Sequence, residues 1–439
     1  MTIRDFAHPP RETETRIRSR NVLLDPETFR SPPAAYRGAP FWSWNGELNR
    51  ERLFEQLGVY QKMGMGGAHM HVRTGMTTPY LGDEFLAIVR DCVDEAERLG
   101  MLGWLYDEDR WPSGFAGGLV TRDPRYRVRH LVMTRKRWEP GEVRMCPTHH
   151  GEPLPNSDRE FVAAWAVRFD DEGRLEASRR VDESGEVGVG ETALYAYREI
   201  VPSWSWFNNQ QYLDTLNPEA GRRFIESTHE RYAEALGDRM GRSAPAIFTD
   251  EPLFRTMERP ADPHDASDLR LPWTDGLPAA YADRFGDDLL DALPAVFYDR
   301  CDGGHFLTRW RFYDNLTERF VETFARQLGQ WCGEHGIALT GHMMEEPTLG
   351  RQSRWVGEVM RSLYHFQLPG IDMLCDREEL LTIKQAQSIA RQRDRAGVLS
   401  ELYGVTNWDF PFAGHLAQGN WQTALGVSVR VHHLTWYSM

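Results

Sequence analysis

The sequence predicts an α/β protein built on a (β/α)8 TIM barrel, with an antiparallel β module inserted between strands 3 and 4 and a chain that ends at strand 8. Eight short apolar runs recur along the 439 residues, most are separated by an amphipathic helix, and polar side chains gather where each run ends. No glycine-rich phosphate-binding fingerprint follows any run, which argues against the rival open, doubly wound sheet.

The runs are recognised by apolar residues followed by turn or helix signals. They lie at residues 39–45, 66–73, 101–109, 244–252, 337–346, 369–376, 397–404 and 429–439. After the second run, Leu86, Val89, Val93 and Ala96 repeat with a helical period. A helix is therefore expected to begin near Asp83.

Four segments follow from the positions of the runs and from changes in composition. They are an extended, proline-rich N-terminal arm (1–38), barrel strands 1–3 (39–124), the inserted β module (125–205) and barrel strands 4–8 (206–439), with an insertion at about 255–305. The inserted module alternates apolar with polar residues, as strands with one exposed face do. Because the chain stops on strand 8, no residues are left for an eighth helix. Either the arm covers that groove or, as we favour, the chain is a fragment of a longer protein.

The composition excludes some classes of function. The formal net charge of -14 would repel a phosphate polymer or an anionic membrane, so neither nucleic acid nor membrane is an expected partner. The five cysteines are scattered without CxxC spacing, which predicts reduced thiols. The N-terminus lacks the apolar core of a signal peptide and no apolar run is long enough to span a bilayer, so a cytoplasmic location is expected.

Polar groups at the carboxyl ends of the runs form the predicted site, since the active site of a (β/α)8 barrel lies at that end. An aliphatic core has no use for so many titratable side chains, whereas a polyhydroxyl substrate does. Fifteen Trp and fifteen Tyr add flat rings on which sugar faces stack. The predicted carbohydrate-binding residues are Trp44, Asn45, His69, His71, Arg73, Asp107, Asp109, Trp111, Asp250, His342, Asp372 and Tyr403.

Two isolated glutamates stand out at these ends. Glu251 comes after strand four and Glu401 after strand seven, so a barrel would carry them on opposite sides of its mouth. Glycoside cleavage needs two carboxyl groups, one protonated to donate to the leaving oxygen and one ionised as nucleophile or base. Burial and the neighbouring Asp250 would raise the pKa of Glu251, which suits the acid. In the structural alternative, Glu251 caps the following segment and Glu401 pairs with an arginine.

The tripeptide HMH offers a different chemistry. His69 and His71 share one face of a strand because side chains alternate, and an HxH pair binds zinc in metal-dependent hydrolase barrels. Here the pair follows strand two and not strand one, and no lysine ends strand four. Binding of sugar hydroxyls is therefore the preferred role, with the metallohydrolase as the alternative.

Asp107, Glu108 and Asp109 form a candidate metal site. Consecutive carboxylates can supply the oxygen ligands that calcium prefers, whereas a solvated turn at the start of a loop is the alternative. If the strand continues, Asp107 and Asp109 share a face and Glu108 lies opposite. Calcium is the cofactor considered, and no organic cofactor is expected.

Several long blocks resemble one enzyme family. The stretches PFWSWNGELN, GWLYDEDRWPSGFAGG, IFTDEP and SELYGVTNWDF are similar to the catalytic barrel of the bacterial α-L-rhamnosidases of glycoside hydrolase family 106 and their uncharacterised relatives. The resemblance runs from about residue 30 to the C-terminus.

This resemblance implies an inverting mechanism with two glutamates and a calcium ion that helps to hold the sugar. Carried to this chain, it makes Glu251 the general acid and Glu401 the base, with Glu345 as the competing candidate. Family members usually continue into β-sandwich domains, and this chain does not. The expected function is hydrolysis of terminal α-L-rhamnoside-like sugars. A non-catalytic carbohydrate-binding barrel and the metallohydrolase are the alternatives.

Overall fold

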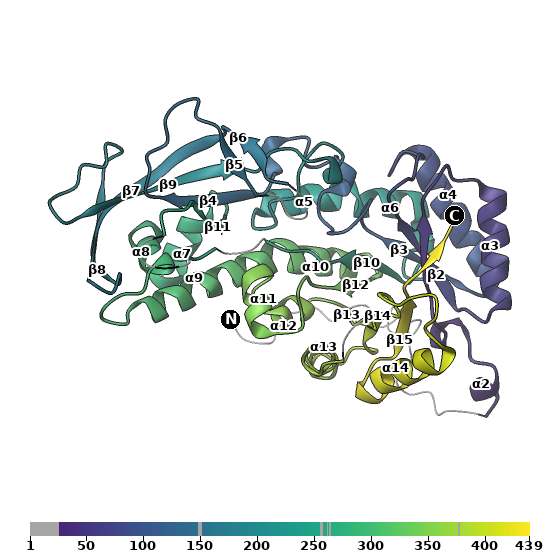
Figure 1. The fold of residues 1–439 in the computed structure, drawn as a ribbon. Helices are drawn as coiled ribbons and strands as arrows, with labels where there is room; N and C mark the ends of the chain where they lie inside the picture. The colour runs from purple at the N-terminus through teal and green to yellow at the C-terminus, as the bar shows by residue number, and fades with distance from the viewer. Residues whose placement is uncertain (1–25, 148–151, 255–257, 261, 263–264, 376–377) are drawn as a thin grey trace.

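A nearly closed, barrel-like parallel sheet of nine strands forms the centre of the protein (Figure 1). The structure is a computed structural model, and it describes residues 26–147, 152–254, 258–260, 262, 265–375 and 378–439. Most of the predicted N-terminal arm lies outside these residues.

Each of the eight predicted runs contains a strand of this sheet. The strands are β1 (Phe41–Trp44), β2 (Gly67–Val72), β3 (Leu102–Tyr106), β10 (Ala246–Asp250), β12 (Ala338–His342), β13 (Leu368–Asp372), β14 (Leu399–Leu402), β15 (Val429–His432) and β16 (Thr435–Trp436). The eighth run supplies two strands, which the sequence did not predict. β15 pairs with β14 and β16 pairs with β1, so this run bridges the two ends of the sheet.

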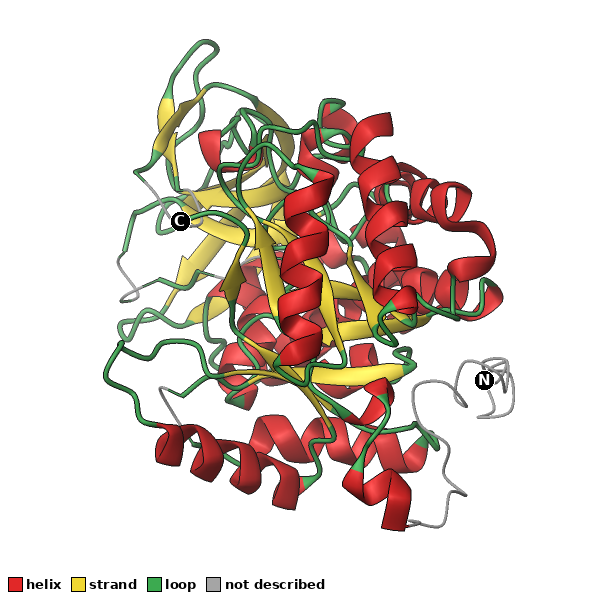
Figure 2. Ribbon diagram, turned by 90° about the vertical axis from the view of Figure 1, so that its right-hand side faces the viewer, coloured by secondary structure: helices red, strands yellow, loops and turns green. Residues whose placement is uncertain are grey.

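Helices cover the outside of the sheet and separate consecutive strands from β1 to β15 (Figure 2). They include α3 (Arg50–Lys62), α4 (Asp83–Arg98), α5 (Pro218–Ser227), α6 (His229–Leu236), α9 (His305–Phe320), α10 (Arg326–Glu334), α11 (Leu349–Trp355), α12 (Val359–Leu363), α13 (Leu381–Gln392) and α14 (Phe412–Leu425). Helix α4 begins at the predicted residue and buries the predicted apolar stripe. Within the described ranges, no helix has both the length and the apolar character to cross a membrane.

The inside of the barrel is filled by aromatic and aliphatic side chains. Phe41 and Phe248 meet edge to face with ring centroids 5.0 Å apart, and the Tyr106 ring stacks 6.0 Å from Phe248. Because side chains alternate along a strand, the inward-facing residue two positions after Phe248 is Asp250. The aromatic layer is therefore the floor beneath the polar residues at the carboxyl end of the sheet.

A separate antiparallel sheet lies at the opposite end of the protein from α3 and α4, above α7 (Leu277–Phe285), α8 (Leu289–Phe297) and α9 in Figure 1. Its strands, in spatial order, are β11 (Leu269–Trp273), β4 (Arg129–Thr134), β9 (Thr192–Ile200), β7 (Arg159–Phe169) and β8 (Leu175–Val181). The hairpin β5 (Arg144–Cys146) and β6 (Leu154–Asn156) accompanies it. β11 falls within residues 255–305 and was not predicted. It contains Pro272, which a sheet tolerates at its edge, and β11 is an edge strand.

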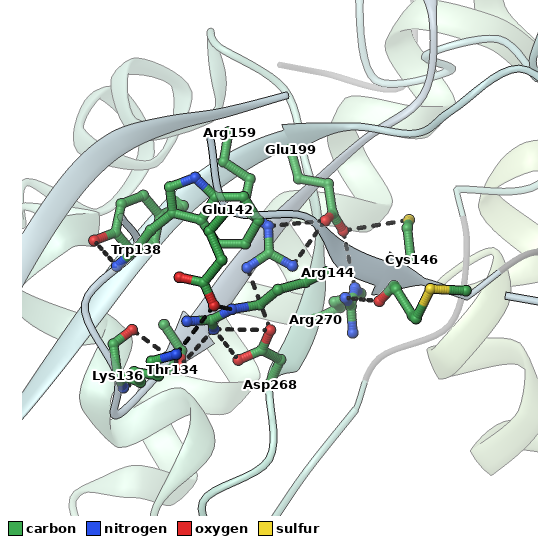
Figure 3. A network of polar contacts seen from close by, with 12 residues as sticks. Thr134, Lys136, Trp138, Glu142, Arg144, Cys146, Arg159, Glu199, Asp268 and Arg270 are labelled. Carbon is green, nitrogen blue, oxygen red and sulfur yellow. Dashed lines mark hydrogen bonds and ion pairs between the residues drawn. The ribbon is translucent and has the colours of Figure 1, made fainter. Parts of the chain in front are cut away.

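A buried ion network joins the strands of this second sheet (Figure 3). Glu199 of β9 accepts a hydrogen bond of 2.9 Å from Arg270 of β11 and one of 3.1 Å from Arg159 of β7. Burial alone would raise the pKa of Glu199, but a hydrogen bond from His130 and the charge of Arg270 hold it well below the ordinary value. His130, Cys146 and Glu199 lie close enough to hold a metal ion. The two guanidinium groups already neutralise Glu199, so this set is better explained as a structural network.

Removing the charge of Glu199 should destabilise this sheet. Glu199→Gln leaves Arg159 and Arg270 without their buried counter-charge, a change that typically costs about 3–5 kcal/mol. Because the pKa is lowered in the folded state, this stabilisation is present above the unfolded pKa and is lost as pH falls. Urea denaturation at pH 7 and pH 4 measures both effects.

Glu160→Gln is the matched control, since Glu160 forms an exposed ion pair with Arg198 on the same two strands. Loss of this exposed ion pair should lower the free energy of unfolding by less than about 1 kcal/mol. Equal destabilisation by the two variants would contradict the role given to the buried network.

Candidate active site

Inward-facing side chains of six strands or strand ends converge above the aromatic floor. Alternation places every second residue of each strand inside the barrel, so sequence positions far apart meet at one end. The residues that meet there are His71, Arg73, Asp250, Glu251, His342, Glu346, Asp372, Glu401 and His433. The mouth of the barrel is therefore rich in carboxyl groups.

His342 lies at the centre of these acids. Its Nε2 atom is 3.3 Å from Oδ1 of Asp250 and 4.0 Å from Oε2 of Glu401. Glu251 and Asp372 also place a carboxylate oxygen within 4.8 Å of a ring nitrogen of His342. One imidazole thus stands among four carboxyl groups from three other strands.

Asp250 and His342 form a buried ion pair. Burial alone lowers the pKa of His342, but the hydrogen bond and charge of Asp250 raise it well above the ordinary value, which favours the imidazolium. Burial alone would raise the pKa of Asp250, but hydrogen bonds from His342 and Tyr106 lower it. Asp250 therefore carries the negative charge of the pair.

The pKa values of Glu251 and Glu401 are raised, whereas that of Asp250 is lowered. Burial raises the pKa of Glu251 well above its ordinary value, and the charges of Asp250 and Asp372 add to the effect. Burial also raises the pKa of Glu401, again assisted by Asp372 and Asp250. The charge of Glu251 contributes to the pKa of Glu401, so ionising one glutamate makes it harder to ionise the other. A state with one protonated and one ionised glutamate is favoured over two carboxylates.

The backbone turns sharply where three of the strands end. Glu251, Glu345 and Tyr403 follow β10, β12 and β14 with φ angles of 48°, 58° and 75°, in the left-handed region. Residues other than glycine rarely adopt this region, and such strain clusters at functional sites. At Glu251 the turn breaks the alternation of β10, so two adjacent acids, Asp250 and Glu251, both reach His342.

Two residues that the sequence did not single out hold Asp250 in place. Tyr106 donates a hydrogen bond of 2.6 Å to Oδ2 of Asp250. The Ser113 hydroxyl accepts a hydrogen bond of 2.8 Å from the Asp250 backbone N–H and donates one of 2.6 Å to Asp107. Both of these residues lie well over a hundred positions from Asp250, so no local pattern indicates the contact.

Glu346 and His433 also join the site, whereas Glu345 does not. Glu346 accepts hydrogen bonds of 3.1 Å from the backbone N–H groups of Met343 and Asp372, and burial raises its pKa to about 7. His433 places Nε2 3.7 Å from Glu401. Glu345 forms an ion pair with Arg351 of α11, joined by a hydrogen bond of 2.7 Å.

The three consecutive acids of the proposed metal site have separate partners. Asp107 is buried against Ser113, and Asp109 pairs with Arg110 at 2.7 Å. Both oxygens of Glu108 accept backbone N–H groups, from Asp109, Gly114, Ala116 and Gly117 at 2.6–2.9 Å. Glu108 therefore organises the loop after β3, and these three residues do not fit a calcium ion.

The acids around His342 do not fit a calcium ion either. In the described part of the chain, every set of three His, Cys, Asp or Glu side chains close enough to hold a cation includes a histidine. Calcium prefers an all-oxygen shell, and a protonated imidazole repels cations.

Other predicted binding residues are distributed between the floor and the outside of the barrel. His69 lies in the floor, where its Nδ1 is 3.0 Å from the Ala39 carbonyl and burial lowers its pKa to about 3. Trp44 is buried on the outer face against Phe85. The described residues supply no third ligand that would complete a zinc site with His69 and His71.

Asn45 and Tyr403 also point away from the acids. The Asn45 amide exchanges two hydrogen bonds, of 2.7 and 2.9 Å, with the backbone of Ser438. The Tyr403 ring lies against His415 and His432, with centroids 5.0 and 5.3 Å away.

His71 and Arg73, by contrast, face the site from β2. His71 is neutral, because burial and then the charge of Arg73 lower its pKa well below the ordinary value. The Arg73 guanidinium lies 5.2 Å from the centre of the Trp111 ring. His71 also packs against Tyr106, the residue that binds Asp250, with ring centroids 4.2 Å apart.

Comparison with known proteins adds a structural relative. No family model and no curated protein matches the sequence. The structure is similar to that of the rhamnosidase from Novosphingobium sp. PP1Y, with a TM-score of 0.66 and 13% sequence identity. The match covers 94% of this chain and 56% of that chain, so this chain spans little more than half the length of that rhamnosidase. The two proteins share a fold, and membership of family 106 stays a prediction.

Replacing His342 should raise the pKa of Asp250. His342→Gln removes the imidazolium, so the effect of burial on Asp250 would be opposed only by the Tyr106 hydrogen bond and the charge of Arg73 among these groups. Carboxyl carbon NMR shifts followed through a pH titration measure the change. Tyr106→Phe, which removes a neutral donor, should raise the pKa by less. An unchanged Asp250 titration in His342→Gln would contradict the ion pair.

Proposed function

We propose that this protein is a glycoside hydrolase that removes terminal α-L-rhamnoside-like sugars. The observation that carries the proposal is a pair of glutamates, the half-buried Glu251 and the buried Glu401, with raised pKa values around one Asp–His ion pair. The fold shared with a rhamnosidase supports it. We also propose that the barrel-like sheet is a (β/α)8 barrel and that residues 125–205 are its inserted module.

Glu251 is proposed as the general acid. Its neighbour Asp250 stays ionised, and a negative charge beside a buried carboxyl keeps that carboxyl protonated. A protonated Glu251 can give its proton to the leaving oxygen as the glycosidic bond breaks. Asp250 itself is engaged through one oxygen by Tyr106 and through the other by His342, which leaves it a supporting role.

Glu401 is proposed as the base that activates water. It lies near both His342 and His433, at 4.0 and 3.7 Å, and the positive charge of His342 lowers its pKa relative to burial alone. In an inverting reaction the ionised base takes a proton from water, which attacks the sugar from the face opposite the leaving group. Inversion is part of the proposal, and product anomers observed by NMR would test it.

Glu251→Gln and Glu401→Gln should each reduce turnover of an aryl α-L-rhamnoside by about 10²–10⁴-fold, because each removes a proton-transfer group. Gln keeps the shape of the side chain, so thermal unfolding should change little. Initial rates and melting curves measure the two effects.

Glu345→Gln decides between the two candidate bases. Glu345 pairs with Arg351, so this variant should keep most of the activity. A loss as large as that of Glu251→Gln, with full activity in Glu401→Gln, would transfer the role of base to Glu345.

The acidic limb of the pH profile should lie above the ordinary carboxyl range. In the free enzyme this limb reports ionisation of the base, and the pKa of Glu401 is raised above the usual value of about 4.3. Activity should therefore fall as pH drops through a midpoint above that value. Measurement of kcat/KM from pH 3 to 9 gives the midpoint, and a limb at or below pH 4 would exclude Glu401 as described.

A further inference from the structure

Three indole rings stand beside the acidic mouth. Trp111, in the loop after β3, meets Trp206 edge to face, with ring centroids 4.7 Å apart and planes at 89°. Trp204 lies 6.4 Å from Trp206 at an interplanar angle of 31°. All three side chains are half-buried, so each keeps part of its surface open. Trp204 and Trp206 belong to the segment that follows the antiparallel sheet.

Hydrogen bonds fix this segment to the loop after β3. The Trp206 indole N–H donates to the Trp111 carbonyl at 3.1 Å. The Asn208 amide donates to Asp109 at 2.8 Å and to the Gly117 carbonyl at 3.0 Å. The rings are therefore held in place before any ligand binds, which lowers the entropic cost of binding.

The backbone of the segment is also unusual. Asn208 and Asn209 both have left-handed φ angles, 55° and 59°. Consecutive residues in this conformation cost energy and persist where the surroundings hold them. With this backbone conformation, Asn208 binds the loop after β3 and Trp206 packs against Trp111.

Arg73 connects the indoles to the acids. Its guanidinium lies 5.2 Å from the Trp111 ring centre, and its charge lowers the pKa of Asp250. Among the described residues, none forms a hydrogen bond or an ion pair with this guanidinium. Arg110, in the same region, differs, since it pairs with Asp109 at 2.7 Å and lies 5.8 Å from the Trp206 ring.

His71, two residues before Arg73 in the chain, is a second group with unused hydrogen-bonding capacity. His71 Nε2 is buried and has no hydrogen-bond partner in the part of the chain that the structure describes. A buried polar atom normally finds a partner. Arg73 and His71 therefore offer donors or acceptors to a ligand, and Arg73 does so next to the Trp111 ring.

We propose that Trp111, Trp206 and Arg73 form a second sugar subsite, which binds the sugar on the leaving-group side of the bond cleaved at Glu251. This inference rests on the proposed function and deepens it: the substrate class is an oligosaccharide end, in which the leaving group is itself a pyranose. A pyranose has an apolar face for the indoles and hydroxyls for the guanidinium. A small alcohol would leave the indole surface and Arg73 without contacts.

Substrates that differ only in the leaving group test the proposal. Wild-type kcat/KM should be at least about tenfold higher for a rhamnosyl disaccharide than for methyl rhamnoside. A tenfold ratio is about the free energy that stacking of one ring contributes. Trp206→Leu and Arg73→Gln should remove most of this preference, mainly through a higher KM for the disaccharide. Trp206→Leu should cleave methyl rhamnoside at close to the wild-type rate, so the loss in this variant is confined to the disaccharide.

Trp408→Ala is the matched control, because Trp408 is 99% exposed and makes none of these contacts. It should leave the ratio of the two substrates unchanged. Trp206→Phe, which keeps a ring, should retain part of the preference. Circular dichroism and melting curves establish that each variant is folded, and Arg73→Gln tests the subsite if Trp206→Leu unfolds.

Three results would overturn the subsite. They are a wild-type enzyme with no preference for the disaccharide, an equal loss on both substrates in Arg73→Gln and Trp206→Leu, and a larger effect of these variants on a planar aryl rhamnoside than on the disaccharide. Failure of the proposed function looks different, because the wild-type protein would then cleave none of the three substrates. Calorimetry with the disaccharide would still support a sugar subsite if both variants lost binding.

Discussion

The ion pair between Asp250 and His342 is the interaction on which the rest of the site depends. Four carboxyl groups around one point would repel one another and stay protonated if nothing compensated their charge. The imidazolium of His342 lies 3.3 Å from Asp250 and balances its negative charge. Asp250 can therefore stay ionised although it is buried. The remaining acids then face a fixed negative neighbour, so the pKa of Glu251 is raised while Asp250 stays ionised. The neighbouring residues Asp250 and Glu251 thus differ in charge: Asp250 is ionised and Glu251 is protonated.

The loop after β3 connects Asp250 to the segment that follows the antiparallel sheet. Glu108 collects four backbone N–H groups and shapes the loop, while Ser113 ties it to Asp250. The segment after β9 then fastens onto the same loop through Asn208 and Trp206. The segment that follows β9 therefore reaches the mouth of the barrel through a chain of hydrogen bonds. This gives the antiparallel sheet a physical route to influence what the barrel binds.

The predictions that succeeded depend on short-range patterns. Eight apolar runs indicated the strands of the parallel sheet, and a helical repeat located the start of α4 at Asp83. Period-two alternation indicated that His69 and His71 share a face, but it could not say that His69 lies one layer lower, in the aromatic floor. The same limit applies to Trp44, whose position at a strand end suggested the mouth while its parity placed it outside. β11 escaped prediction because it is a short edge strand with a proline, and its pairing partner is more than a hundred residues away.

By itself, the sequence determined which residues end the strands, because hydrophobic period and turn chemistry are local properties of the chain. It placed Asp250, Glu251, His342, Asp372 and Glu401 at carboxyl ends, and the barrel brought these ends together. Only the tertiary structure decided their charges, since a pKa depends on burial and on partners from other strands. It also separated Glu346, which is buried beside Asp372, from Glu345, which turns outward to Arg351. Adjacent glutamates look alike in a sequence, and the left-handed turn at Glu345 is what tells them apart.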